Sequence, residues 1–375
     1  MGSGDAEGRL FNASGRARQL RASPLFAIGP SAPGPALRRG FLLAVPIGLA
    51  LILELGAGAP TKGAIATGAL VNGFPGMDAP ARPRAAWQVA TAPLIGLFAA
   101  FGVLTSQVGI LAVLGLGLVG LAAGYCFAVS LRLAIVGLTV ALATLIAQGL
   151  FLSTADAVPA LLYGTLGGLT QVAWSLLVWL AVDRAADQPE KAWDARAAAR
   201  ALRANLSLRS HSARHAIRFG ACLAAGVAAY RLLGMRDHGY WIPLTILFVM
   251  RPERDETDRR LVLRAIGTLI GLTLATAIAE ACGGEDLVVG AVLTLAAALS
   301  FGLLTVQYAL FTAAITTYVV LMSSTLGEGA FKAAGQRASG TVIGIAIAFV
   351  AWRLWPNPRG ALDLASQPNM GGAGS

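Results

Sequence analysis

The sequence is poor in charge, in cysteine and in histidine. Charged residues make up 13% of its 375 positions, whereas soluble domains have about 25%. The three cysteines lie far apart, without a C-x-x-C pair or a histidine at ligand spacing, so we expect neither a disulfide framework nor a metal site. Because no Ser/His/Asp constellation, Walker loop or H-E-x-x-H motif occurs, we expect no enzyme and no cofactor. The three histidines, His211, His215 and His238, are expected to be structural.

Hydrophobic residues, in contrast, make up 56% of the chain, and the mean hydropathy is +0.68. A helix that crosses a bilayer needs roughly 20 apolar residues. Charged residues and Gly/Pro clusters delimit twelve apolar segments, six on each side of a polar linker. We therefore predict an all-α membrane protein with about twelve transmembrane helices, near 38–57, 61–75, 85–105, 107–129, 132–153, 157–182, 213–234, 238–251, 260–282, 286–303, 305–324 and 333–355.

The predicted organisation has five parts. Residues 1–35 and 357–375 are rich in small and polar residues and are expected to be disordered tails. Residues 36–182 and 213–356 hold six segments each. The linker at 183–212 is Ala-rich, with acidic residues early and Arg late, which favours a basic helix at the cytoplasmic surface near anionic headgroups. Recruitment of a partner by this linker is the alternative.

Basic residues give the expected orientation. If every segment crosses and the N-terminus is cytoplasmic, 24 of the 29 Lys and Arg residues lie on the cytoplasmic side. The other side keeps only Lys62, Arg231, Arg236, Lys332 and Arg337. This asymmetry follows the positive-inside rule and places both termini in the cytoplasm. It also explains the net charge of +10 without a nucleic acid as partner.

The second segment of each half is short. Gly239 to Met250 has about a dozen apolar residues, or some 18 Å of helix at 1.5 Å per residue. Such a segment is either re-entrant or a short crossing inside a protein-lined cavity. Crossing is favoured, because with five spans per half the basic linker would lie on the outside.

The two halves resemble each other at a spacing of about 175 to 180 residues. Because each half has an even number of segments, the repeats run in the same direction, with a pseudo-twofold axis along the membrane normal and a pathway between them. The matching stretches are ALRRG at 36–40 with AIRFG at 216–220, PLIG at 93–96 with TLIG at 268–271, and 164–179 with 340–355.

Small residues four positions apart predict close helix packing, as in other membrane helices. The pairs are Gly120 with Gly124, Gly164 with Gly168, Gly267 with Gly271, and Gly340 with Gly344.

The stretch 239–268 is the one most suited to binding chemistry. Arg260, Arg264 and Thr268 are spaced to share one helix face, and Arg264 lies inside the apolar run, where a charge usually faces a cavity or a partner. A guanidinium binds a carboxylate through two hydrogen bonds, while Trp241 or Tyr240 could contact an aromatic ring. With Arg251, these residues predict a site for an organic anion, which the nearby rings would allow to be aromatic.

A structural role is the alternative for each of these side chains. Arg259, Arg260 and Arg264 could reach lipid headgroups or pair with the acidic residues at 253–258, and Trp241 could belong to an aromatic belt. Aligning the two L-I-G sequences places Val89 opposite Arg264, so the site is expected in the second half alone.

Two carboxylates are candidates for carrying protons. Glu54 and Glu280 lie near the outer ends of the first and ninth segments, where a buried acid could serve a coupled transporter. Solvated helix ends explain both residues equally well.

The stretch Tyr240-Trp-Ile-Pro-Leu-Thr245, followed by Arg251-Pro252, Arg259-Arg260 and Gly267-Thr268-Leu269, resembles the fusaric-acid-resistance-like family of inner-membrane proteins, which includes aromatic acid exporters. The resemblance covers residues 236–275 and extends over the second half, whereas the first half fits by its repeat organisation. Family members often carry a larger cytoplasmic domain where this chain has about 30 residues. The family is similar to plant aluminium-activated malate channels, in which two six-helix subunits surround an anion pore. The resemblance implies organic-anion movement and a pathway at Arg260, Arg264, Trp241 and Thr268.

Three hypotheses follow for the function. The first is a proton-coupled exporter of aromatic or other organic acids in the bacterial inner membrane. The second is a passive anion channel, and the third is a non-transporting membrane scaffold. Expected partners are the lipid bilayer and a small organic anion. The sequence is also compatible with a homodimer.

Overall fold

The computed structural model describes residues 32–56, 63–150, 153–183, 195–208, 210–235, 239–282, 286–325 and 330–356. All regular structure in these ranges is helical, with thirteen α-helices. The two expected tails, except for residues 32–35, together with Lys62, Arg236 and His238, lie outside the described ranges.

Each of the twelve predicted segments is a helix, with ends within about six residues of the prediction. In the first half these are α2 (Pro33–Gly56), α3 (Ala64–Asn72), α4 (Ala81–Ser106), α5 (Gly109–Tyr125), α6 (Leu131–Leu150) and α7 (Ala157–Val178). In the second half they are α9 (His211–Leu232), α10 (Trp241–Val249), α11 (Arg254–Cys282), α12 (Asp286–Leu303), α13 (Tyr308–Thr325) and α14 (Ala330–Leu354). A thirteenth helix, α8 (Ala195–Ala204), lies in the linker.

The charged starts of helices account for the larger differences. The sequence prediction began the ninth segment at 260, but α11 begins at Arg254 and has Asp255 and Glu256 in its first turn. Carboxylates there interact favourably with the positive end of the helix dipole, so a charged run that looks like a loop continues the helix. Pro243 lies in the first turn of α10, where its missing N–H costs no helix hydrogen bond, so it does not kink the helix.

The chain is a multi-pass membrane protein. Eight helices are long and apolar enough to cross a bilayer: α2, α4, α5, α6, α7, α11, α13 and α14. The stretch Leu287–Leu303 of α12 is a shorter apolar helix. The remaining predicted segments, α3, α9 and α10, are helical but fall outside this group.

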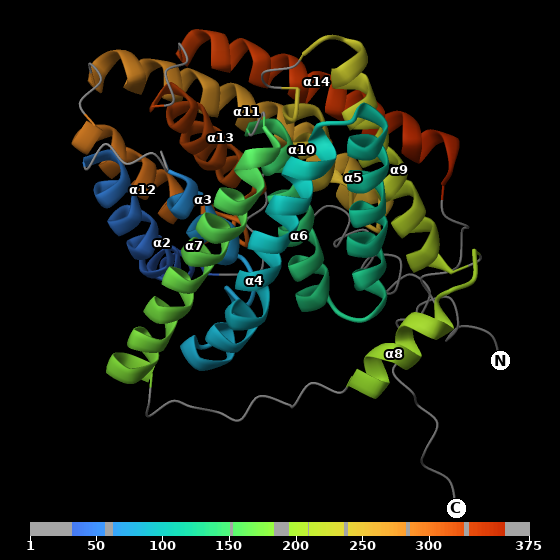
Figure 1. The fold of residues 1–375 in the computed structure, drawn as a ribbon, viewed down its shortest axis with the longest axis horizontal. Helices are drawn as coiled ribbons and strands as arrows, with labels where there is room; N and C mark the ends of the chain where they lie inside the picture. Colours follow the sequence, from blue (N-terminus) through green and yellow to red (C-terminus); the bar gives the residue numbers. More distant parts are fainter. Residues whose placement is uncertain are drawn as a thin grey trace, which may run out of the picture.

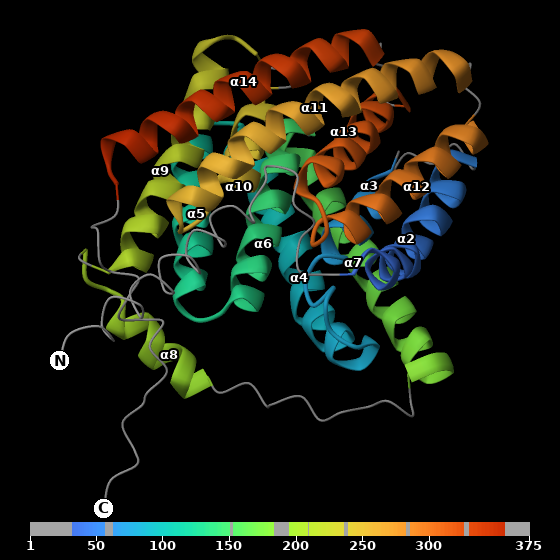
Figure 2. The same ribbon diagram turned by 180° about the vertical axis from the view of Figure 1, so that it is seen from behind.

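The helices pack so that the two halves of the chain interleave. Figure 1 shows α2 beside α12 at one end of the molecule and α5 beside α9 at the other. In each of these pairs, the first helix of one half lies along the fourth helix of the other half. The helices α11 and α14 run side by side along one edge in both views, and α8 lies apart from the bundle (Figure 2).

Glycines permit the close crossings, as predicted. A Cβ on Gly120 or Gly124 would meet α9, one on Gly164 or Gly168 would meet α4, and one on Gly267 or Gly271 would meet α13. A Cβ on Gly340 would lie 2.5 Å from the Cβ of Trp241. All four predicted pairs therefore lie at helix contacts, where a larger residue would force the backbones apart.

The short helices α3 and α10 have nine residues each and are mostly buried. The residue before α3, Gly63, has φ of 85°, a conformation that favours glycine. The side chain of Glu54 reaches the start of α3 from α2: its two carboxylate oxygens accept hydrogen bonds from the N–H groups of Ile65 and Ala66, both at 3.0 Å. An acid from another helix thus binds the N-terminus of α3.

Candidate functional site

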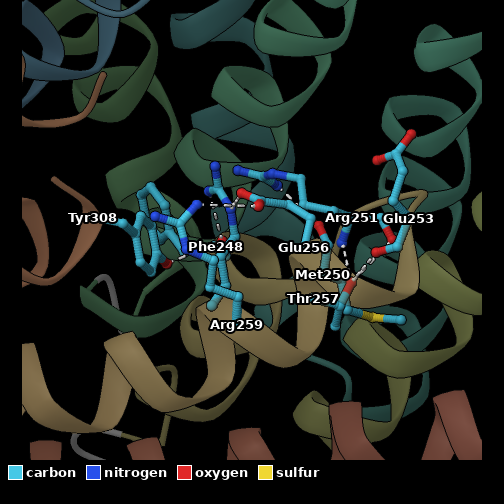
Figure 3. Close-up of polar contacts among 9 residues, drawn as sticks. Phe248, Met250, Arg251, Glu253, Glu256, Thr257, Arg259 and Tyr308 are labelled. Atoms are coloured by element: carbon cyan, nitrogen blue, oxygen red, sulfur yellow. Dashed lines mark hydrogen bonds and ion pairs between the residues drawn. The ribbon is translucent and has the colours of Figure 1, made fainter. Parts of the chain in front are cut away.

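The corner between α10 and α11 is held by hydrogen bonds around Thr257. Its hydroxyl accepts from the N–H of Arg251 at 3.0 Å and lies 3.0 Å from the carbonyl oxygen of Glu253 (Figure 3). The guanidinium of Arg251 turns back to the carbonyl of Met250, at 2.9 Å. Burial, and then the nearby charge of Arg260, lower the pKa of Arg251. Arg251 therefore fixes this turn, with its side chain engaged by the backbone.

Glu256 forms ion pairs with two arginines that follow it on α11. The Nε of Arg260 donates to a Glu256 oxygen at 2.6 Å, and Arg259 lies 3.8 Å from the other oxygen (Figure 3). Arg260 also stacks on the ring of Tyr308, 4.5 Å from its centroid. For Arg259 and Arg260 the structure thus confirms the predicted pairing with an acidic residue.

Arg264 lies one turn further along α11 and has no such partner. It is 0% exposed, and its Nε, Nη1 and Nη2 make no hydrogen bond of standard geometry within the described ranges, although the Tyr308 hydroxyl lies near enough to interact with the guanidinium. No ion pair of the described residues includes it. The guanidinium carbon lies 5.2 Å from the ring centroid of Phe248, on α10. The alternative in which Arg264 reaches lipid headgroups is wrong, because the side chain is enclosed.

Hydroxyl groups continue this polar face along α11. Thr268 follows Arg264 by one turn, and the neighbouring Gly267 packs against Thr312 on α13. The hydroxyls of Thr268, Thr312 and Thr316 are buried and lack a hydrogen-bond partner among the described residues. Threonines in helices usually donate to the carbonyl four residues earlier, as Thr273 and Thr276 do on the same helix. The seam between α11 and α13 therefore offers buried polar groups that the protein itself leaves unbonded.

A second buried arginine, Arg337 on α14, was missed as a site residue. It is 1% exposed, and its Nε and Nη1 have no hydrogen-bond partner in the described part of the chain. Its guanidinium carbon lies 4.6 Å from the ring centroid of Trp241, and the charge of Arg264 acts on it electrostatically. Along the sequence, Arg337 counts only as a charge on the outer side. Its position inside the predicted segment 333–355 was a signal that it is buried.

The two aromatic residues predicted for the site open α10. Tyr240 and Trp241 are buried, with ring centroids 4.2 Å apart. An aromatic-belt residue faces the membrane interface, so the belt alternative for Trp241 is wrong. The structure thus joins Trp241 to Arg337 and Phe248 to Arg264, on one face of α10.

A cavity lies beside this face of α10. It is lined by α3, α6, α10 and α13, with Tyr240, Trp241 and Phe248 on one wall and Tyr318 on another. The volume open to the centres of water-sized molecules is about 90 Å³, several times the ~10–15 Å³ that one water needs. Both halves of the chain contribute to its walls, and the two rings that contact Arg264 and Arg337 face it.

The first half has a different polar core. Asn72 donates to the carbonyls of Gln88 and Gly168, and Ser175 donates to the Gln88 side chain at 2.7 Å. Val89, which the L-I-G alignment places opposite Arg264, is 52% exposed, whereas Gln88 is fully buried. Gln88, the residue before Val89, is thus the buried counterpart of Arg264. Because Gln88 is neutral, the predicted asymmetry between the two halves remains.

The two predicted proton carriers differ in their surroundings. Glu54 is 4% exposed and bound to α3, so its explanation as a solvated helix end is wrong. Glu280 is exposed in the last turn of α11. Of the two, only Glu54 touches an element that lines the cavity.

One known protein family matches the second half of the chain. Residues 223–351 match the fusaric acid resistance protein-like family. These residues include α10, α11 and α13, the buried Arg264 and Arg337, and most of the second half. The family resemblance noted from the sequence is therefore confirmed for this region.

Curated relatives match over part of their length. The chain is 41% identical to the inner membrane protein YccS of Escherichia coli over 38% of this chain and 20% of that protein. It is 30% identical to the uncharacterized protein ORF2 of Neisseria gonorrhoeae, over 42% of this chain and 37% of the relative. The chain thus spans between about a fifth and just over a third of these two relatives. No solved structure matches.

Proposed function

We propose that the chain is the membrane part of a transporter that exports organic anions, foremost aromatic carboxylates, from the bacterial cytoplasm. The observation that carries this proposal is Arg264, a fully buried guanidinium that has no ion pair and no hydrogen bond of standard geometry with any described residue. An unpaired buried charge is costly, and such residues in membrane proteins mark pathways for substrates or ions. A carboxylate on Arg264 would supply the missing hydrogen bonds, with the Thr268 hydroxyl beside it and Phe248 against an aromatic ring.

We further propose twelve spans arranged as two parallel repeats. Support comes from the reciprocal pairing of α2 with α12 and of α9 with α5, which a twofold axis between the halves would generate. The short helices α3 and α10 have the same length and occupy equivalent places in the order of elements. Both line the cavity together with α6 and α13, the fifth helices of the two halves. In this arrangement the pathway runs between the repeats, and both termini are cytoplasmic.

Proton coupling is assigned to Glu54. Its carboxylate fixes the start of α3, and α3 forms a wall of the cavity. Protonation would weaken both hydrogen bonds to α3, so uptake of a proton would free a cavity wall. Arg260 and Arg251, near the α10–α11 corner, would form the cytoplasmic approach to the site. The exporter, rather than an enzyme, is the function that these groups support.

The test is flux of aromatic and aliphatic carboxylates in proteoliposomes, with the pH gradient and the membrane potential imposed separately. Arg264→Gln removes the charge and all but one donor group, and we expect flux to fall about 10- to 100-fold, the equivalent of one charged hydrogen bond of about 1.5–3 kcal/mol. The matched control is Arg254→Gln, an arginine on the same helix that is exposed and paired with Asp258.

Each outcome has a distinct meaning. Saturable flux that needs the pH gradient supports the coupled exporter, whereas flux driven by potential alone indicates an anion channel. Equal flux in wild type and Arg264→Gln would remove Arg264 from the mechanism. Absence of flux for every carboxylate, in folded protein, would favour the scaffold.

A further inference from the structure

Two buried positive charges, and not one, lie at the proposed site. Arg264 on α11 and Arg337 on α14 are both essentially unexposed, and five of their guanidinium nitrogens lack a hydrogen bond in the described chain. The two guanidiniums lie over rings of the same helix, α10: Arg264 over Phe248 and Arg337 over Trp241, and the charge of Arg264 acts on Arg337. No ion pair between described residues includes either side chain. Like charges this close in a low-dielectric interior repel, so the empty site has an excess of two positive charges.

The surroundings of Arg337 add to this excess. Its guanidinium stacks on Trp241, the first residue of α10, where the helix dipole is positive. In the first half, the equivalent end of α3 is neutralised by the carboxylate of Glu54, which binds the N–H groups of the second and third helix residues. The corresponding residues of α10 are Ile242, whose N–H donates to Gly239, and Pro243, which has no N–H. The Nε and Nη1 of Arg337 thus supply free donors near this end of α10.

We propose that Arg264 and Arg337 form one site for an organic dianion, a molecule with two acidic groups of which one binds each guanidinium. This inference rests on the proposed function and names the class of its substrate. A dianion would balance both charges and satisfy donors on both arginines, whereas a single carboxylate leaves one guanidinium unpaired. Arg337 is then a specificity-determining residue, which sets the preference for two charges over one.

The experiment compares matched pairs of anions, benzoate with isophthalate and butyrate with succinate. Binding is measured by thermal shift of the purified full chain, and flux by counterflow in proteoliposomes. In wild type, each dianion should bind at least tenfold more tightly than its monoanion. Arg337→Gln should reduce dianion affinity at least tenfold and change monoanion affinity by less than twofold. Arg337→Lys, which keeps the charge, should retain part of the dianion preference.

A second readout separates binding from folding. Because Arg337 is an uncompensated buried charge, Arg337→Gln should raise the melting temperature of the ligand-free protein. Lys332→Gln, an exposed cation on the same helix, should change neither the melting temperature nor the affinities. A lower ligand-free melting temperature for Arg337→Gln, with an intact dianion preference, would overturn the inference and make Arg337 structural.

The proposed function and this inference fail in different ways. If monoanions bind as well as dianions and binding depends on Arg264 alone, the inference is overturned while the transporter stands. If no carboxylate of either charge binds or moves, in wild type or variant, both proposals fail.

Discussion

At the scale of single residues, the clearest contrast is between buried groups that are bonded and buried groups that are not. Glu54 is bonded through both oxygens, whereas Arg264 and Arg337 leave donors free. A buried polar group without a partner costs free energy, and a buried ionisable group in a membrane protein usually marks a pathway for substrates or ions. The unbonded arginines are therefore assigned to binding, and the bonded carboxylate holds a helix in place.

Substitutions of Glu54 should affect both stability and proton-driven flux. Glu54→Ala removes both acceptors from the start of α3, and we expect a loss of about 1–2 kcal/mol in stability, the range for a lost N-terminal cap. Glu54→Gln keeps one acceptor oxygen and should lose less, but proton-driven flux should lose its dependence on the pH gradient. Thermal unfolding in detergent and proteoliposome flux measure the two effects.

Glu280→Ala is the matched control, because Glu280 is exposed on α11 and makes no hydrogen bond to α3. An unchanged melting temperature for Glu54→Ala would show that this cap contributes no stability. A pH gradient that still drives flux in Glu54→Gln would exclude Glu54 as the coupling group.

At the scale of helices, the site depends on how closely α14 approaches α10. Gly340 lies at this crossing, three residues after Arg337, and Gly344 faces the carbonyl of Ile242 one turn further on. The absence of side chains there lets Arg337 reach the ring of Trp241. The close approach of two helices thus creates the contact between a cation and an aromatic ring that the site uses.

Gly340→Ala tests this contact. Its Cβ would lie 2.5 Å from that of Trp241, so the helices must separate, and we expect a loss of about 1–3 kcal/mol, as for overpacked cores. Anion affinity should fall as well, because the Arg337 guanidinium stacks on the ring of Trp241 and would move with it. Thermal unfolding and the binding assay described for Arg337 measure both quantities.

Gly335→Ala on the same helix provides the comparison. A Cβ at Gly335 meets nothing within 4 Å, so this change should be neutral or stabilise the helix by up to about 1 kcal/mol. Equal melting temperatures for Gly340→Ala and Gly335→Ala would contradict the close crossing.

At the scale of the whole molecule, the two halves are interleaved rather than placed side by side. The first helix of each half lies against the fourth helix of the other, at opposite ends of the bundle (Figure 1). The first helix of each half packs more extensively on the other half than on its own. We therefore expect the halves to fold and unfold together, and the cavity between them to depend on both.

Cross-linking tests this interleaving. A Cβ on Gly48 of α2 would lie 3.5 Å from the Cβ of Thr294 on α12, at the short end of the range found in disulfides. In a chain without its native cysteines, Gly48→Cys with Thr294→Cys should therefore cross-link on oxidation. With a protease site added in the linker at 184–194, the two cut halves should stay joined on a non-reducing gel.

The control pair combines Gly48→Cys with Ala224→Cys, on α2 and α9. Gly117 of α5 is the neighbour of Ala224 in the structure, so this control pair should not cross-link. Separation of the halves with Gly48→Cys and Thr294→Cys, or cross-linking in the control, would contradict the interleaved arrangement.

The sequence by itself determined the membrane class, the helical segments, the four glycine pairs at helix contacts and Arg264 as the central candidate. These depend on local composition and spacing, since a bilayer requires long apolar helices and small residues permit close packing. Only the tertiary structure decided that Arg260 stacks on Tyr308 of α13, that Glu54 caps α3 and that Arg337 lies with Arg264 against α10. Each of these depends on which helices become neighbours, and α11 and α14 meet through packing between segments some 70 residues apart. Whether a buried charge has a partner depends on this packing. It could therefore not be predicted from the positions of charged residues in the sequence.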